Sequence, residues 1–317
     1  MSPYFTNDAI VTGILLVVLA LIFYTAQHQS SFWKRFYRFV PALLLCYFIP
    51  ALLNWPLGLI SGDESSLYFV SSRYFLPACL VLLCLSIDLQ GILNLGPKAL
   101  IMFIAATLGI IIGGPIALYL VLSIAPGLIP ANPDELWRGL STVAGSWIGG
   151  GANQTAMKEI FQVSDQLFGT MVVVDVVVAN IWMGFLLYGA NVAPKVDRWL
   201  KSDTSAIVDL QRRVENYRAS VEKNPTTTDL FIMLGVAFGG TALAHWGADV
   251  ITPLMMKHEE TLHAMRLESL TSSFFWIIVI ATTIGFSLSF TRAKALEGVG
   301  ASKWGSIFIY FLVATIG

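Results

Sequence analysis

The residues best suited to chemistry lie in one apolar stretch with a glycine-rich, polar centre. Leu140–Phe161 has the length and flanks of a membrane-spanning helix, but its middle reads Gly149-Gly150-Gly151-Ala152-Asn153-Gln154-Thr155. Each glycine costs up to ~1 kcal/mol in a helix interior, and unwound backbone at membrane depth must be buried in protein or line a wet cavity. The pattern predicts a broken helix of the kind that forms sites in secondary transporters. The alternative is a patch of small residues for tight helix packing.

The polar side chains at this break suit either a cation or an anionic solute. Asn153, Gln154 and Thr155 offer amide and hydroxyl oxygens to a hard cation, or donors to an anionic group. A half-helix that begins near Ala152 would add the positive end of its dipole, which suits a carboxylate. The same groups could instead cap the broken helix ends, so both interpretations stay open for each residue.

An acidic residue in the next apolar run is the strongest candidate for ion coupling. Asp175 lies in MVVVDVVVANIWMGF, with three valines on each side. An ionisable group inside a span is costly and indicates function by default. Because burial raises the pKa of a carboxyl and a bound cation lowers it, one carboxylate can exchange a proton for Na⁺. Asn180 follows five residues later, about 140° around the helix. A structural Asp175 that bonds to the broken helix is the alternative.

Three further residues are weaker candidates. Asp88 lies near the end of the third apolar run, where an aspartate is more often a solvated boundary residue. His245 and Asp249 are four residues apart on one helix face, so they could relay protons or form a local hydrogen bond. No Ser/His/Asp order, P-loop or dinucleotide-binding glycine pattern is present. We therefore expect no enzyme, no cofactor and no metal site other than Na⁺ near Asp175.

The composition is that of a polytopic membrane protein. Of 317 residues, 56% are hydrophobic and 12% are charged, whereas a soluble domain carries about 25% charged residues. The net charge of −1 gives no basic surface for nucleic acid. Cys46, Cys79 and Cys84 lie in apolar runs, which predicts buried thiols without a disulfide framework. The first apolar run has no convincing cleavage site, so we interpret it as a retained span.

Apolar runs of spanning length predict about nine membrane helices. They fall at Asp8–Ala26, Phe39–Ile60, Tyr74–Leu89, Ala99–Leu122, Leu140–Phe161, Leu167–Ala190, Asp229–Met256, Leu270–Phe290 and from Trp304 onward. The polar stretch 191–228 divides the chain into residues 1–190, an extra span plus a first repeat, and residues 229–317, the start of a second repeat.

The charge distribution predicts the orientation in the membrane. The positive-inside rule places the 191–228 linker in the cytoplasm, and we expect the plasma (inner) membrane. Strict alternation over nine spans then puts the N-terminus inside but leaves Lys34, Arg35 and Arg38 outside, which is a poor fit. A re-entrant Leu140–Phe161 would remove that conflict and place the N-terminus outside.

A faint internal echo suggests a repeat. Ser72–Lys98 resembles Ser273–Lys303: each opens with aromatic residues, runs apolar to a Leu-Ser pair, and continues through a polar linker to a lysine. Transporters often carry inverted repeats of this kind. A partner for the broken segment would then lie beyond Gly317, so we expect the second repeat to be incomplete in this sequence.

Several stretches resemble a known family. They are Phe39–Ala51, Arg73–Asp88, Gly96–Pro115, Gly145–Phe161 and Val173–Gly184, and they are similar to the YjcL-like family of bacterial multi-pass membrane proteins, labelled as domain of unknown function 819. The family is similar in plan to crossed-helix transporters, which include sodium/proton antiporters and bile-acid and glutamate symporters. The resemblance implies an all-α membrane helix bundle with two inverted five-span repeats, each with one broken helix that crosses the other near the midplane.

These features together favour an ion-coupled secondary transporter, driven by Na⁺ or H⁺, of an unidentified small solute. A sodium/proton exchanger without an organic solute would depend mainly on Asp175, whereas a solute symporter should also need Asn153–Thr155. A non-transporting membrane binding or assembly protein is the alternative from another class. The expected partners are the solute, the coupling ion and membrane lipid, with no nucleic acid, and a homodimer is left open.

Overall fold

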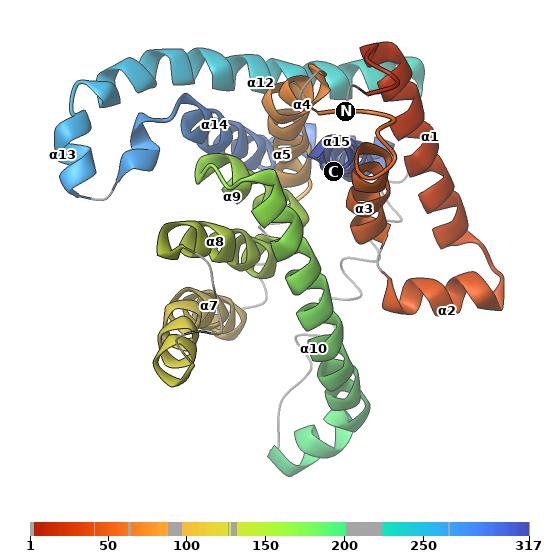
Figure 1. Ribbon diagram of the computed structural model, residues 1–317, viewed down its shortest axis with the longest axis vertical. Coiled ribbons are helices and arrows are strands. Elements are labelled where there is room, and N and C mark those ends of the chain that lie inside the picture. The colour runs from red at the N-terminus through yellow and green to blue at the C-terminus, as the bar shows by residue number, and fades with distance from the viewer. Residues whose placement is uncertain are drawn as a thin grey trace.

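The computed structural model describes residues 3–40, 42–62, 65–87, 97–125, 127, 132–200, 224–265 and 267–316, and its regular structure there is helical (Figure 1). The all-α membrane fold expected from the sequence is confirmed. In chain order the helices are α1 (Asp8–Gln27), α2 (Ser31–Phe39), α3 (Ala42–Asn54), α4 (Leu67–Val70), the π-helix η1 (Ser71–Phe75), α5 (Leu76–Leu85), α7 (Pro97–Ile124), α8 (Pro133–Gly149), α9 (Gly151–Ile160), α10 (Asp165–Leu200), α12 (Thr227–Met256), α13 (Glu259–Ala264), the 3₁₀-helix η2 (Glu268–Thr271), α14 (Ser273–Leu288), the 3₁₀-helix η3 (Arg292–Val299) and α15 (Ala301–Ile316).

The core forms around α5. Eight of its ten residues are buried, and its sequence LPACLVLLCL has no polar face that could be turned to solvent. A helix that is apolar all round requires neighbours on every side. Gly240 of α12 and Gly285 of α14 both lie against Val81, and Gly305 of α15 lies against Leu83. At Gly285 a Cβ would be 2.6 Å from the Val81 carbonyl oxygen, so only glycine permits this approach.

A second apolar cluster joins α1, α3 and α15. Val11, Leu15, Leu19 and Ile22 form one buried stripe along α1, and they pack with residues of α3 and α15. The opposite side of α1 is apolar but exposed, as a lipid-facing surface requires. The most apolar stretch of α7, within Leu100–Ile124, contains no buried residue at all. An apolar helix without burial in the monomer fits contact with lipid or with a partner helix.

The described residues contain fewer candidate spans than the nine expected. Among them, five helices are long and apolar enough to cross a membrane, or up to seven if two sharply bent pairs each count as one span. One half of each pair lies in a predicted run: Ala42–Asn54 in Phe39–Ile60, and Ser273–Leu288 in Leu270–Phe290. The other halves, Ser31–Tyr37 and Arg292–Val299, lie outside these runs, and the halves meet at 86° and 97°. The run from Trp304 onward is a shorter apolar helix, Ala301–Ile316. The expected linker is helical to Leu200, and residues 201–223 lie outside the described residues.

The two segments of the internal echo lie side by side and run in the same direction. Near their starts, the guanidinium of Arg73 lies 4.1 Å from the ring centroid of Phe274. Further along both, Val81 meets Gly285. An inverted repeat is related by an axis in the membrane plane, which would reverse one helix relative to the other. This pair therefore lends no support to the expected inverted repeat.

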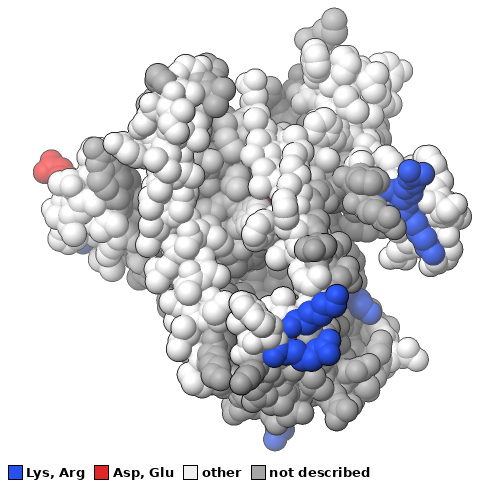
Figure 2. Space-filling model, turned by 90° about the horizontal axis from the view of Figure 1, so that it is seen from below, with Lys and Arg blue, Asp and Glu red and all other residues white. Residues whose placement is uncertain are grey.

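Basic side chains gather at one end of the molecule. Lys34 and Arg35 on α2 and Lys195 and Arg198 on the last turns of α10 are exposed. In Figure 1 the last turns of α10 lie at the bottom and α2 lies at the right, below the middle; Figure 2 shows Lys and Arg side chains on the face seen from below. The positive-inside rule favours one membrane side for such groups. The orientation of the chain in the membrane stays a prediction.

Candidate functional site

The predicted helix break is present at Gly150, between α8 and α9, but the two halves do not continue as one span. Gly150 has φ +83° and ψ −175°, a conformation essentially restricted to glycine. The chain reverses there, and Arg138 near the start of α8 donates to the carbonyl of Phe161 just after α9, at 2.6 Å. α8 and α9 therefore form a helical hairpin (Figure 1).

Two physical reasons explain why the expected crossing helix is a hairpin. The arms approach closely because Gly145 has no side chain: a Cβ there would be 2.8 Å from Cγ of Met157. In addition, the ten residues of α9 span only about 15 Å, roughly half of the hydrocarbon core. The stretch Leu140–Phe161 thus lies in two antiparallel helices and not in one continuous span. Whether it is re-entrant or crosses a second broken helix stays a prediction.

The polar residues at the hairpin tip differ in their contacts. The side chain of Asn153 folds over Gly149, where its amide occupies the space of the missing Cβ. Thr155 is buried, and its hydroxyl donates to the Gly151 carbonyl at 2.9 Å, the back-bond that threonine commonly makes within a helix. Gln154 is 2% exposed, and its Nε2 has no hydrogen-bond partner among the described residues. A buried orphan donor costs about 1–3 kcal/mol, so Gln154 is the best candidate of the three for ligand contact.

Asp175 joins the hairpin to α10. The Ser146 hydroxyl donates to its Oδ2 and the indole Nε1 of Trp147 donates to its Oδ1, each at 2.7 Å. Both donors lie in the last turn of α8, where the Gly150 amide donates to the Ser146 carbonyl at 2.7 Å. The half-buried carboxylate is therefore attached one turn before the break. The sequence reasoning missed these donors, although a Ser-Trp pair directly before the glycines was a usable signal.

The remaining predicted site residues are not gathered here. Asn180 belongs to α10, but its side chain lies outside the described residues, as does the whole of Asp88. A ring nitrogen of His245 lies 2.8 Å from the Arg73 carbonyl oxygen, and its ring stacks on Tyr74. Asp249 is exposed. No hydrogen bond joins His245 to Asp249 in the described part of the chain, so the predicted relay is not formed.

A buried ionic cluster connects the base of the hairpin to its neighbours. Nζ of Lys158, with a side chain 5% exposed, lies 2.8 Å from Oδ1 of Asp165 and 3.2 Å from Oε1 of Glu159. It also donates to the hydroxyl of Tyr68 at 2.5 Å. Arg73 of η1 pairs with Oε2 of Glu159 at 3.4 Å. Two cations and two anions therefore lie together; Lys158 and Glu159 are largely buried, whereas the side chain of Asp165 is 67% exposed.

The environment of this cluster alters how its members titrate. α9 is not among the candidate spans. Burial, together with the negative charge of Asp165, raises the pKa of Glu159 to about 7. Burial lowers the pKa of Lys158, although its hydrogen bond to Asp165 opposes the effect. Glu159 is thus a carboxyl able to exchange a proton near neutral pH.

The sequence reasoning did not single out the ionic cluster. The signal was present, because Lys158 and Glu159 are adjacent charges inside an apolar run, where ionisable groups usually have a partner and a function. The partner Arg73 lies in η1, whose π-helical turn is a feature that often marks functional sites. Ser71 in the same turn is completely buried, and its hydroxyl has no hydrogen-bond partner within the described ranges.

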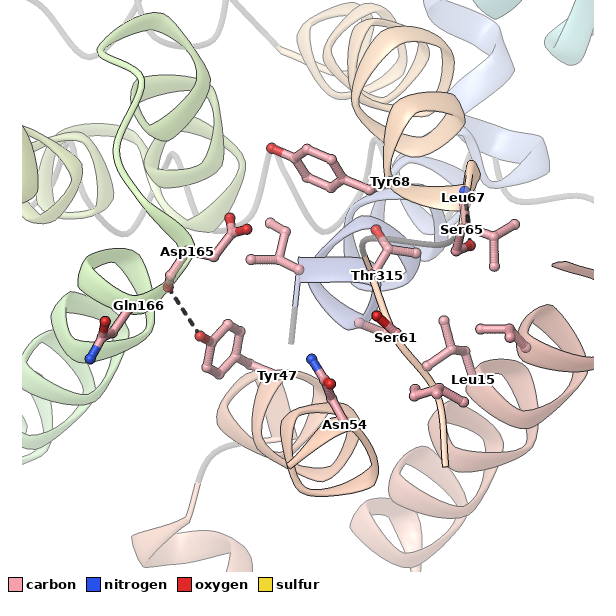
Figure 3. Close-up of a pocket in the computed structure, with 15 residues that line it drawn as sticks. Leu15, Tyr47, Asn54, Ser61, Ser65, Leu67, Tyr68, Asp165, Gln166 and Thr315 are labelled. Carbon is pink, nitrogen blue, oxygen red and sulfur yellow. Dashed lines mark hydrogen bonds between the residues drawn. The ribbon is translucent and has the colours of Figure 1, made fainter. Parts of the chain in front are cut away.

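A cavity of about 320 Å³ lies beside the cluster (Figure 3). It is lined by residues of α1, α3, α4, the start of α10 and the end of α15, and by residues 60–62 and Ser65. Its polar lining consists of Tyr47, Asn54, Ser61, Ser65, Tyr68, Asp165, Gln166 and Thr315. The Tyr47 hydroxyl donates to the Asp165 carbonyl at 3.3 Å. Neither Asp175 nor the hairpin glycines line this cavity, so the predicted site and the observed hollow are separate.

The fold and this site define a multi-pass, all-helical membrane protein with a glycine-hinged hairpin. The chain belongs to the family described as "Protein of unknown function (DUF819)", whose model matches residues 13–317. No curated protein and no solved structure matches the chain.

Replacing the hinge glycine should destabilise the hairpin. We expect Gly150→Ala to lower the free energy of unfolding by about 1–3 kcal/mol, because alanine is strained at this φ and ψ. The matched control is Gly113→Ala in α7, where an added Cβ meets no atom within 4 Å and the helix should gain up to ~1 kcal/mol. Thermal unfolding midpoints in detergent compare the two, and equal midpoints would show that Gly150 is not under conformational constraint.

Proposed function

We propose that this protein is an ion-coupled secondary transporter, driven by Na⁺ or H⁺, that moves a small solute across the plasma (inner) membrane. One observation carries the proposal. The carboxylate of Asp175 lies inside a candidate span and accepts hydrogen bonds on both oxygens from the turn that precedes a glycine break. A carboxylate in this position can bind Na⁺ or a proton and hold the hairpin in a different arrangement in each state.

The coupling follows from competition for the same two oxygens. A cation or proton on Asp175 weakens the bonds from Ser146 and Trp147, because those donors favour the free carboxylate. An ion can shift a conformational equilibrium only by as much as its affinities for the two states differ. Loss of these contacts on ion binding would supply that difference, with Gly150 as the hinge. The exchanger without an organic solute uses the same device and needs no solute site.

A non-transporting assembly protein is the second candidate, and a specific observation favours it. The apolar stretch of α7 contains no buried residue in the monomer, and the side chains of Thr155 and Asn153 make contacts within the hairpin itself. Under this alternative α7 would pack against another copy or another membrane protein, and Asp175 would be a structural hydrogen-bond acceptor. Ion binding distinguishes the two functions, since assembly alone requires none.

Trp147 provides a direct test of ion binding. We expect addition of NaCl to the detergent-purified protein, or a fall in pH, to shift its tryptophan emission saturably, because the indole loses its bond to Asp175. Choline chloride at equal concentration controls for ionic strength. The Trp147→Phe variant should lose the shift while the other tryptophans remain. Identical titrations for the wild type and this variant would remove the main support for the transporter.

A further inference from the structure

The cavity presents a carboxylate and no other charged side chain. Asp165 is the one charged residue among those that line it in the described part of the chain, and its side chain is 67% exposed. Figure 3 shows the carboxylate of Asp165 and the hydroxyl of Tyr68 facing each other at one end of the cavity. The other polar groups of the lining are neutral hydroxyls and amides. The negative charge that this wall presents is that of Asp165, offset in part by the ammonium of Lys158, which lies 2.8 Å from its Oδ1.

These same groups already hold an ammonium ion. Nζ of Lys158 lies 2.8 Å from Oδ1 of Asp165, 2.5 Å from the Tyr68 hydroxyl and 4.5 Å from the centroid of the Tyr68 ring. Lys158 itself is buried on α9 and does not line the cavity. A carboxylate and a tyrosine ring together are the chemistry that recognises a primary amine. The exposed side of Asp165 offers that chemistry to a second ammonium group.

The rest of the cavity fits a hydrocarbon chain. Val11 and Leu15 of α1, Ile60, Leu67 of α4 and Ile316 of α15 supply apolar wall. A volume of about 320 Å³ is at the lower end of the usual range for small-molecule sites. The polar groups can bind one charged end of a ligand, and the apolar walls can contact its tail. The cavity therefore suits an amphiphilic molecule of modest size.

We propose that this cavity binds a small primary amine, with the ammonium group on Asp165 and the tyrosine hydroxyls and its apolar tail along α1 and α15. The binding site itself is independent of the proposed function. Its role as the site for the transported solute rests on that function. The position of Asp165 supports this role, because Asp165 and Asp175 belong to the same helix. Ten residues of α10 separate them by about 15 Å.

Binding of hexylamine to the detergent-purified protein tests this proposal. We expect saturable binding by calorimetry, with hexan-1-ol and hexanoate, probes of the same length, showing none. Asp165→Asn should weaken binding roughly tenfold or more, since a charged hydrogen-bond acceptor is lost. Asp197→Asn, on the same helix outside the cavity, should bind like the wild type. Tighter binding of hexanoate, or unchanged affinity in Asp165→Asn, would overturn the proposal.

A second variant covers the case in which Asp165→Asn fails to fold because it leaves Lys158 without its partner. Asn54 is exposed at the end of α3 and lines the cavity, so Asn54→Phe should narrow the hollow and reduce hexylamine binding without touching the ionic cluster. Retained affinity in a folded Asn54→Phe variant would place the amine elsewhere.

The same chemistry is present in a lipid headgroup, and a comparison of nanodiscs separates the two sources. We expect equal hexylamine affinity in phosphatidylcholine and phosphatidylethanolamine discs. Competition by phosphatidylethanolamine would show that the cavity binds a lipid headgroup, and it would overturn the proposal that the ligand is a free amine. Failure of the transporter proposal would look different, since amine binding would persist while the Trp147 titration and ion flux showed no dependence on Asp175.

Discussion

Ion flux through proteoliposomes that contain the Asp175→Asn variant is expected to fall to the rate of empty liposomes. An amide at this position cannot take up a proton, and it binds Na⁺ far more weakly than a carboxylate. Asparagine keeps one acceptor oxygen, so one of the two bonds from Ser146 and Trp147 remains. Loss of the other costs only about 1 kcal/mol, and the variant should fold. Uptake of ²²Na⁺ and dissipation of a pH gradient measure the effect.

The matched control for this prediction is Asp249→Asn. Asp249 also lies in a candidate span, on α12, but it is exposed and distant in sequence from the hairpin. We expect its flux to equal that of the wild type. Wild-type flux in Asp175→Asn would exclude this carboxylate as the coupling group. Absence of flux in the wild type, with altered oligomerisation in Asp175→Asn, would instead favour the assembly protein.

The second large effect concerns stability. Lys158→Met should reduce the free energy of unfolding by about 1–3 kcal/mol, because the largely buried Glu159 keeps only Arg73 as a cationic partner and the exposed Asp165 loses its hydrogen-bond donor. The buried lysine is the only residue of the ionic cluster that contacts Asp165, Glu159 and Tyr68 together. Thermal or chemical unfolding in detergent provides the measurement, with helix content followed by circular dichroism.

Two companion variants make this prediction specific. Lys195→Met removes an exposed lysine near the end of α10 and should change stability by no more than about 0.5 kcal/mol. A combined Lys158→Met, Glu159→Gln and Asp165→Asn variant should recover much of the loss, since no unpaired acid remains at Lys158. Equal stability of the Lys158→Met variant and the wild type would mean that the cluster is solvated and contributes nothing to the fold.

Local sequence determined the helical class of this protein and the position of the hinge. Spanning runs of apolar residues identified α1, α7 and α12, because the bilayer sets one length for every membrane helix. The glycine triplet identified the break at Gly150, because a positive φ with extended ψ is accessible to glycine alone. Asp175 was recognisable as well, since an acid flanked by valines needs a buried partner wherever it lies.

Tertiary structure alone decided the direction of the chain after the hinge and the partners of each charge. Glycines predict a break equally well in a crossing helix and in a hairpin; the contact of Gly145 with Met157 selects the hairpin. The donors to Asp175 and the pairing of Arg73 with Glu159 join residues 28, 29 and 86 positions apart. Sequence periodicity carries no information about such distances. Charge balance, cavity shape and the choice among acceptors arise only when separate helices pack.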